Sequence, residues 1–92
     1  MILSMLAILV SLNTHVGFAP LDLVVTVRAV AYSGAICVTV DGPEYHRSCA
    51  PRGKGSPPVR EFKFHLGVPG EYAVITEDDK GKQYQHPIVT VQ

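Results

Sequence analysis

Apolar and polar residues alternate with a period of two along most of this chain. Over residues 21–32 the sequence LDLVVTVRAVAY places Leu23, Val25 and Val27 on one face and Thr26 and Arg28 on the other. Successive side chains of a strand point to opposite faces, so this pattern predicts a long strand with one buried face.

Shorter segments with the same alternation follow, separated by turn residues such as Gly34, Pro43 and Gly81. No segment after Pro20 has the 3.6-residue period of a helix. We therefore expect an all-β domain, a small antiparallel β-sandwich or barrel of about six or seven short strands. The predicted strands cover residues 21–32, 35–41, 44–49, 59–66, 71–77, 82–86 and 88–92.

The first 20 residues depart from this pattern. Residues 1–12 read MILSMLAILVSL, and no charged side chain occurs before Asp22. An apolar run that ends in small residues, here Gly17 and Ala19, is typical of a secretory signal, although no basic residue precedes it. The segment would also span a membrane as an uncleaved anchor, since about 20 helical residues cover a bilayer core.

We accordingly expect residues 1–20 to be a signal peptide or an uncleaved membrane anchor, and residues 21–92 to form the sandwich. In this interpretation Met1–Ala19 is the part of the chain that would touch a membrane. A third interpretation makes the apolar run a strand or helix of a cytosolic domain.

Two cysteines, Cys37 and Cys49, flank the turn formed by residues 41–43. A hairpin folded symmetrically about Pro43 places them opposite each other, so we expect a disulfide across the two strands. It would close a loop of about 13 residues and contribute roughly 3 kcal/mol of stability. Two unlinked thiols in a cytosolic domain are the alternative. The disulfide would indicate an oxidising, extracytoplasmic location, periplasmic or secreted.

The C-terminal quarter resembles the closing hairpin of immunoglobulin-like extracellular modules. Residues 69–77 (PGEYAVITE), the turn 78–81 (DDKG) and residues 88–91 (IVTV) are similar to the last strands of polycystic-kidney-disease-type, fibronectin-type and carboxypeptidase-regulatory-like repeats. The resemblance implies an immunoglobulin-like sandwich. It also implies that Tyr72 is a corner tyrosine, whose hydroxyl bonds to upstream backbone. An ordinary strand tyrosine is the alternative.

Charge and motifs exclude several classes of function. Eight Lys and Arg balance eight Asp and Glu, so the chain lacks the basic surface typical of nonspecific nucleic-acid binding. No catalytic or nucleotide motif is present, and residues 53–56 (GKGS) are no phosphate loop because Pro57 and Pro58 forbid a following helix. We expect no enzyme, no cofactor and no small-molecule substrate.

Two groups of possible metal ligands have plainer explanations. His46 and His65 would meet across the sandwich in some registers, but solvent-facing strand histidines are the interpretation we favour. The carboxylates at 77–79 are typical of calcium loops, but a solvated hairpin tip that needs no metal is the interpretation we favour. Cys37 and Cys49 are spaced too far apart for a zinc site without further ligands. We expect no metal.

An uneven distribution of charge supplies the candidate partner site. Five basic residues and one acidic residue fall between Arg47 and Lys63, whereas residues 71–79 hold four acids and no base. The Gly- and Pro-rich stretch 50–58 is predicted to be a surface loop, and loops on rigid sandwiches commonly bind partners. Ordinary mixed surface charge is the alternative. The residues we expect to bind an acidic partner or anionic headgroups are Arg52, Lys54 and Arg60, together with Arg47.

The sequence thus favours a non-catalytic extracytoplasmic sandwich that acts as an accessory or assembly subunit of a membrane or envelope protein complex. It would bind protein through the basic loop or through an open sheet edge. The alternative is a small secreted ligand-binding or inhibitor module that uses the loop at residues 50–59.

Overall fold

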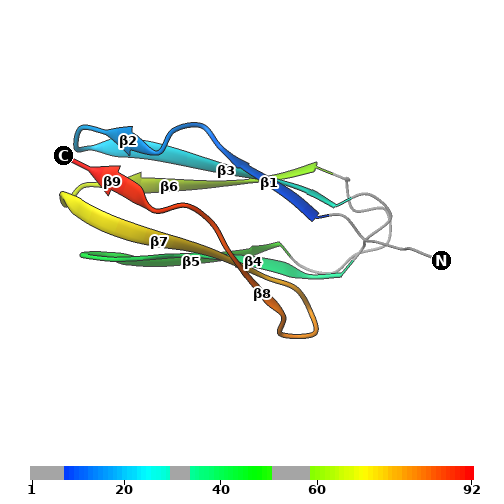
Figure 1. Ribbon diagram of the computed structural model, residues 1–92. Coiled ribbons are helices and arrows are strands. Elements are labelled where there is room, and N and C mark those ends of the chain that lie inside the picture. Colours follow the sequence, from blue (N-terminus) through cyan, green and yellow to red (C-terminus); the bar gives the residue numbers. More distant parts are fainter. Residues whose placement is uncertain (1–7, 30–33, 51–58) are drawn as a thin grey trace.

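The computed structural model describes residues 8–29, 34–50 and 59–92 of this chain. Within these ranges nine strands and no helix are present, and they form two layers (Figure 1). The all-β sandwich expected from the alternation is confirmed. The strands are β1 (Ile8–Leu12), β2 (Val16–Gly17), β3 (Leu21–Ala29), β4 (Ile36–Asp41), β5 (Tyr45–Ala50), β6 (Val59–Leu66), β7 (Gly70–Glu77), β8 (Gln83–Gln85) and β9 (Val89–Val91).

The first sheet has the order β1-β3-β6, and the second has the order β2-β9-β7-β4-β5 with β8 also paired to β7. The pairing of β2 with β9 is parallel, and the other pairs are antiparallel. In Figure 1 the strands β1, β3 and β6 lie above β7, β4 and β5. The outer strands of the larger sheet are therefore β2 on one side and β5 on the other.

The core lies between the sheets and is built from alternate residues of each strand. The inward face predicted for Leu23, Val25 and Val27 is confirmed, because each is fully buried. Burial of such a side chain contributes about 1.5–3 kcal/mol relative to an exposed one. The core residues are Leu23, Val25, Val27, Ile36, Val38, Val40, Phe62, Phe64, Leu66, Tyr72, Val74, Val89 and Val91.

Residues 8–19 pair with both sheets. Strand β1 pairs with β3 from Ile8 opposite Ala29 to Leu12 opposite Val25. The chain then crosses to the second sheet, where the Thr90 amide donates to the His15 carbonyl at 2.8 Å. The described part of the apolar segment is thus integrated into the sandwich. Residues 1–7 lie outside the described ranges, and the assignment of the whole segment as signal or anchor stays a prediction.

Tyr72 lies in the centre of the larger sheet with its ring fully buried. Its hydroxyl donates to the Val68 carbonyl at 2.5 Å, and burial raises its pKa above the ordinary value. The hydrogen bond expected from this tyrosine to upstream backbone is confirmed. Close packing of the ring also explains Gly42, because a Cβ there would lie 2.8 Å from the ring and 2.5 Å from the Glu71 carbonyl oxygen.

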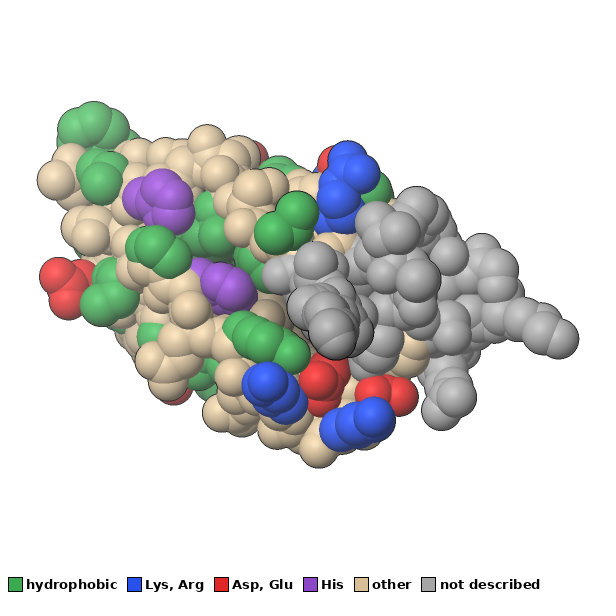
Figure 2. Space-filling view, turned by 45° about the vertical axis from the view of Figure 1, so that its right-hand side comes forward, with side chains coloured by type: hydrophobic (Ala, Val, Ile, Leu, Met, Phe, Trp, Pro, Cys, Tyr) green, Lys and Arg blue, Asp and Glu red, His purple; other side chains and the backbone are tan. Residues whose placement is uncertain are grey.

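Several large apolar side chains remain exposed on the described surface. They are Leu9, Val16, Phe18, Tyr45, Val68 and Ile88. In Figure 2 hydrophobic and His side chains gather on the left of the view, while the Lys and Arg side chains lie nearer the grey residues. Apolar and basic side chains are therefore unevenly distributed on this face. No helix in the described ranges is long and apolar enough to cross a membrane.

Candidate functional site

The hairpin of β4 and β5 has the register expected from its turn. Cys37 lies opposite Cys49, and Asp41 lies opposite Tyr45. A disulfide joins the two cysteines, whose Cα atoms are 4.0 Å apart. The Gly42 amide donates to the Glu44 carbonyl at 3.0 Å and closes the turn. Both the hairpin and the disulfide predicted from the sequence are confirmed.

The direction of the backbone groups on β5 follows from this register. Paired residues alternate between hydrogen-bonded pairs, with Cα atoms about 5.5 Å apart, and non-hydrogen-bonded pairs, about 4.5 Å apart. The short Cα distance between Cys37 and Cys49 identifies a non-hydrogen-bonded pair. The pairs two and four residues along, Thr39 with Arg47 and Asp41 with Tyr45, then belong to the same class.

In a non-hydrogen-bonded pair the N–H and C=O groups point away from the partner strand. The backbone groups of Tyr45, Arg47 and Cys49 therefore point away from β4. The other side of β5 has no neighbour in the order of the described strands. A bond from the His86 amide to the Val74 carbonyl, 3.1 Å, fits the same alternation, because Val74 then points away from β4. Strand β5 is thus an open edge with three outward backbone positions.

The exposed face of this edge carries Tyr45 and Arg47. Tyr45 is 62% exposed. The Arg47 guanidinium donates from Nη1 to Thr39 Oγ1 at 3.1 Å and from Nη2 to Glu77 Oε1 at 3.2 Å. These contacts extend from β5 over β4 to β7, and they bring together the basic and acidic segments noted in the sequence. The ion pair is half exposed, so its own contribution to stability is small.

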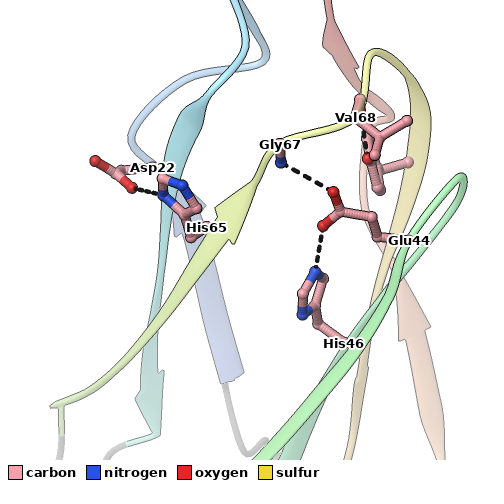
Figure 3. Close-up of polar contacts among 7 residues, drawn as sticks. Asp22, Glu44, His46, His65, Gly67 and Val68 are labelled. Atoms are coloured by element: carbon pink, nitrogen blue, oxygen red, sulfur yellow. Dashed lines mark hydrogen bonds and ion pairs between the residues drawn. The ribbon is translucent and has the colours of Figure 1, made fainter.

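Glu44 and His46 connect the start of β5 to the opposite sheet (Figure 3). His46 Nε2 lies 2.7 Å from Glu44 Oε1, and the Gly67 amide donates to Glu44 Oε2 at 3.0 Å. The His46 ring lies 6.3 Å from that of Phe64 in β6. The bond to His46, followed by those from the Gly67 and Val68 backbone, holds the pKa of Glu44 below its ordinary value of 4.5, despite partial burial.

The predicted docking residues have different positions. Arg52 and Lys54 lie outside the described residues. Arg47 lies on the open edge. Arg60 is only 7% exposed, and its Nη1 donates to the Gly34 carbonyl at 2.9 Å. This placement removes Arg60 from the exposed surface on which we expected it. The alternation of β6 explains why, since Arg60 shares its inward face with Phe62, Phe64 and Leu66.

The candidate metal ligands are engaged in pairs and turns. His65 Nδ1 lies 2.7 Å from Asp22 Oδ1, on strands of the first sheet (Figure 3). Asp78 Oδ1 accepts the amides of Lys80 and Lys82 at 2.9 Å each and so closes the turn after β7. Across the described ranges, no three or more His, Cys, Asp or Glu side chains gather in a way that would hold a metal ion.

A shallow groove of about 290 Å³ lies along β1, β3 and the start of β6. Its lining is formed by Leu9, Val10, Ser11, Thr26, Arg28 and Val59. Among these residues Ser11 and Thr26 carry hydroxyl groups. None of the lining residues is a general base that would activate a hydroxyl as a nucleophile. The groove therefore offers no catalytic arrangement, and the open edge of β5 is the better candidate site.

No model of a known protein family matches the chain, and no curated protein is detectably similar to it in sequence.

Proposed function

We propose that this protein is a non-catalytic binding module that takes a strand of a partner protein onto the open edge of β5. The observation that carries the proposal is the outward direction of the backbone groups of Tyr45, Arg47 and Cys49 on a strand that has no neighbour on one side among the described strands. In strand addition, main-chain hydrogen bonds supply affinity, and side chains that alternate along the edge supply specificity.

The edge is held in a binding-ready conformation, which lowers the entropy lost on binding. The disulfide at Cys49 fixes the end of β5, and the bonds of Glu44 to His46 and Gly67 fix its start. Few of its side chains are buried, so burial alone would hold this strand poorly. These two attachments support β5 as a rigid template for a partner strand.

The side chains on the edge define the partner's chemistry. An added strand would place its residues beside the exposed Tyr45 ring and the half-exposed Arg47. Aromatic or β-branched side chains pair well across strands with a tyrosine, and a carboxylate pairs well with an arginine. We infer a partner strand that alternates apolar and acidic residues.

A location outside the cytoplasm completes the proposal. The disulfide supports an oxidising compartment, since such bonds are rare in reducing cytosol. The apolar sequence MILSMLA at residues 1–7, before the first strand, supports a position close to a membrane. We accordingly propose an accessory or assembly subunit of a membrane or envelope protein complex, without catalytic activity of its own.

A pair of substitutions at residue 47 tests strand addition. Arg47→Pro removes an outward N–H and the side chain, whereas Arg47→Ala removes the side chain alone. The ladder to β4 loses no bond in either variant, because residue 47 is in a non-hydrogen-bonded pair. Full-length protein with a photo-crosslinker at position 45 should capture the same partner in the wild type and, more weakly, in Arg47→Ala, and lose it in Arg47→Pro.

Capture that survives in Arg47→Pro would contradict strand addition. If capture is instead lost in the double variant Arg52→Ala, Lys54→Ala while Arg47→Pro retains it, the partner binds the loop, as the secreted-inhibitor interpretation requires. Circular dichroism and the unfolding midpoint of each variant show whether the sandwich itself is intact.

A further inference from the structure

The side of the sandwich opposite β5 is built from uncharged sequence. Residues 8–21 and residues 83–92 contain no Asp, Glu, Lys or Arg, so every such side chain of the protein lies between positions 22 and 82. These two segments are far apart in the chain, yet β2 and β9 lie side by side in the larger sheet. The fold thus brings part of each uncharged segment together at one edge of the larger sheet.

Three large apolar side chains are exposed there. Phe18 is 76% exposed, Val16 57% and Ile88 54%. Val16 lies beside Thr90 in the register. Because Val89 and Val91 point into the core, Ile88 and Thr90 share the outward side of β9. We call the exposed surface formed by Val16, Phe18 and Ile88 the apolar face.

The surroundings extend this face without adding charge, except at its border. Exposed Ala73 follows Tyr72 on β7, next to the last residue pair of the β7–β9 ladder, Tyr72 with Val89. Glu71 lies beside Thr90 on β7 and is exposed. A carboxylate at the border fits the polar rim of an interface, whereas the centre of an interface is depleted of charge. Scattered apolar residues are ordinary on a surface, but a group on an uncharged edge indicates a contact.

We propose that a second copy of this chain docks on the apolar face to form a two-fold symmetric dimer. In such a dimer the same patch is used by both copies, so a charge near the axis would meet its own copy. The apolar face avoids this repulsion. The formal net charge of zero also leaves little long-range repulsion between copies. A bilayer is a poorer fit, because surface-binding elements typically use Lys, Arg and Trp, and the chain has no Trp.

The proposal is independent of strand addition at β5, because it uses the other edge of the sheet. A dimer joined at its β2 edges leaves both β5 edges free. Such a dimer would present two identical sites, and a partner with two copies of its strand would bind with increased avidity.

Sedimentation velocity of the full-length protein over a concentration series tests the dimer. We expect the weight-average mass to rise from monomer to dimer as the concentration increases. This rise should depend little on salt, because the apolar face contributes no ion pair to the proposed interface. Phe18→Asp should weaken dimerisation at least about tenfold, because it places a charge next to its own copy. The matched control is Tyr45→Asp, an aromatic on the opposite edge that is 62% exposed against 76% for Phe18, and it should leave the dimer unchanged.

A monomer at every concentration would overturn the proposal, as would a dimer that Tyr45→Asp weakens as much as Phe18→Asp. Flotation with vesicles of neutral phosphatidylcholine is the third measurement. Binding of monomers that depends on Phe18 would assign the apolar face to a bilayer and overturn the dimer. Val16→Thr, a nearly isosteric change, should weaken association less than Phe18→Asp and keeps the test informative if the latter unfolds.

Discussion

The two outer strands of the larger sheet, β5 and β2, are attached to the molecule in different ways. Strand β5 is joined to β4 by a disulfide and to the opposite sheet through Glu44. Strand β2 has no such attachment and depends on backbone bonds to β9, such as the Gln92 amide to the Gly17 carbonyl at 2.8 Å. Its neighbour β9 is in turn anchored by buried Val89 and Val91.

Because of this difference, the two edges should lose stability under different conditions. A disulfide and a carboxylate are sensitive to reduction and to acid, whereas a strand supported by buried valines is not. The β5 edge is therefore rigid but can be loosened by reduction or by acid. The β2 edge is stabilised mainly by apolar packing. Perturbations of the two edges should have different sizes and different triggers.

The largest expected effect is on the β5 edge. Changing both Cys37 and Cys49 to Ser should lower the free energy of unfolding by roughly 3 kcal/mol, because the unfolded chain regains the entropy of the closed loop. Urea denaturation measures this loss, and the reduced wild type is the control that should match it. Hydrogen exchange should show faster opening of β5 than of β9. A loss below about 1 kcal/mol would mean that other contacts hold β5.

A smaller effect is expected from Tyr72→Phe, which acts between the two edges. The change removes the hydroxyl bond to the Val68 carbonyl, and Val68 is exposed enough for water to replace it. We expect a loss of about 1 kcal/mol. Tyr72 pairs with β9, and its ring packs against Gly42 of the β4–β5 turn. Because a ring without its hydroxyl bond is held less firmly at both contacts, protection from hydrogen exchange should fall at both edges. Loss confined to one edge would contradict this shared role.

The sequence predicted what depends on local alternation. The strands that became β3 to β7, the inward face of β3 and the opposition of Cys37 and Cys49 all follow from period-two patterns and one turn at Pro43. Arg60 was a different case. Counting basic residues suggested an exposed patch, whereas the alternation in VREFKFHL already placed Arg60 beside Phe62 and Phe64.

Features that depend on distant pairing were not predictable. An apolar run such as residues 8–12 gives the same signal whether it becomes a buried strand, a helix or a leader. The parallel contact of Val16 with Thr90 joins residues near opposite ends of the chain, and no local pattern encodes it. The open side of β5 and the gathering of uncharged segments are consequences of strand order, which became visible only in the fold.

A small pH effect should affect the β8 side of the molecule first. Burial lowers the pKa of His86 below its ordinary 6.5, so the folded state favours the neutral ring, whose Nε2 lies 3.0 Å from Thr76 Oγ1. Its contribution to stability is complete above pH 6.5 and declines as the pH falls from there toward the folded pKa. Urea titrations from pH 7.5 to 5 should show this decline. His86→Gln, which keeps a polar partner for Thr76, should remove it, and an unchanged slope would contradict the assignment.

The β5 side should respond only at more acidic pH. The pKa of Glu44 is held below 4.5 by His46 and the Gly67 and Val68 backbone, so its stabilising effect is present above pH 4.5 and is lost as the pH falls through the folded pKa. Glu44→Gln should therefore flatten the acid side of the stability curve. Asp22→Asn is the matched control, because the Asp22–His65 pair is 82% and 69% exposed and should contribute little. If Asp22→Asn flattens the curve equally, general carboxylate titration and not the Glu44 contact controls acid stability.

Faster hydrogen exchange in β5 than in β9 below pH 4.5 would place the acid-sensitive opening at the edge on which we propose that partners bind.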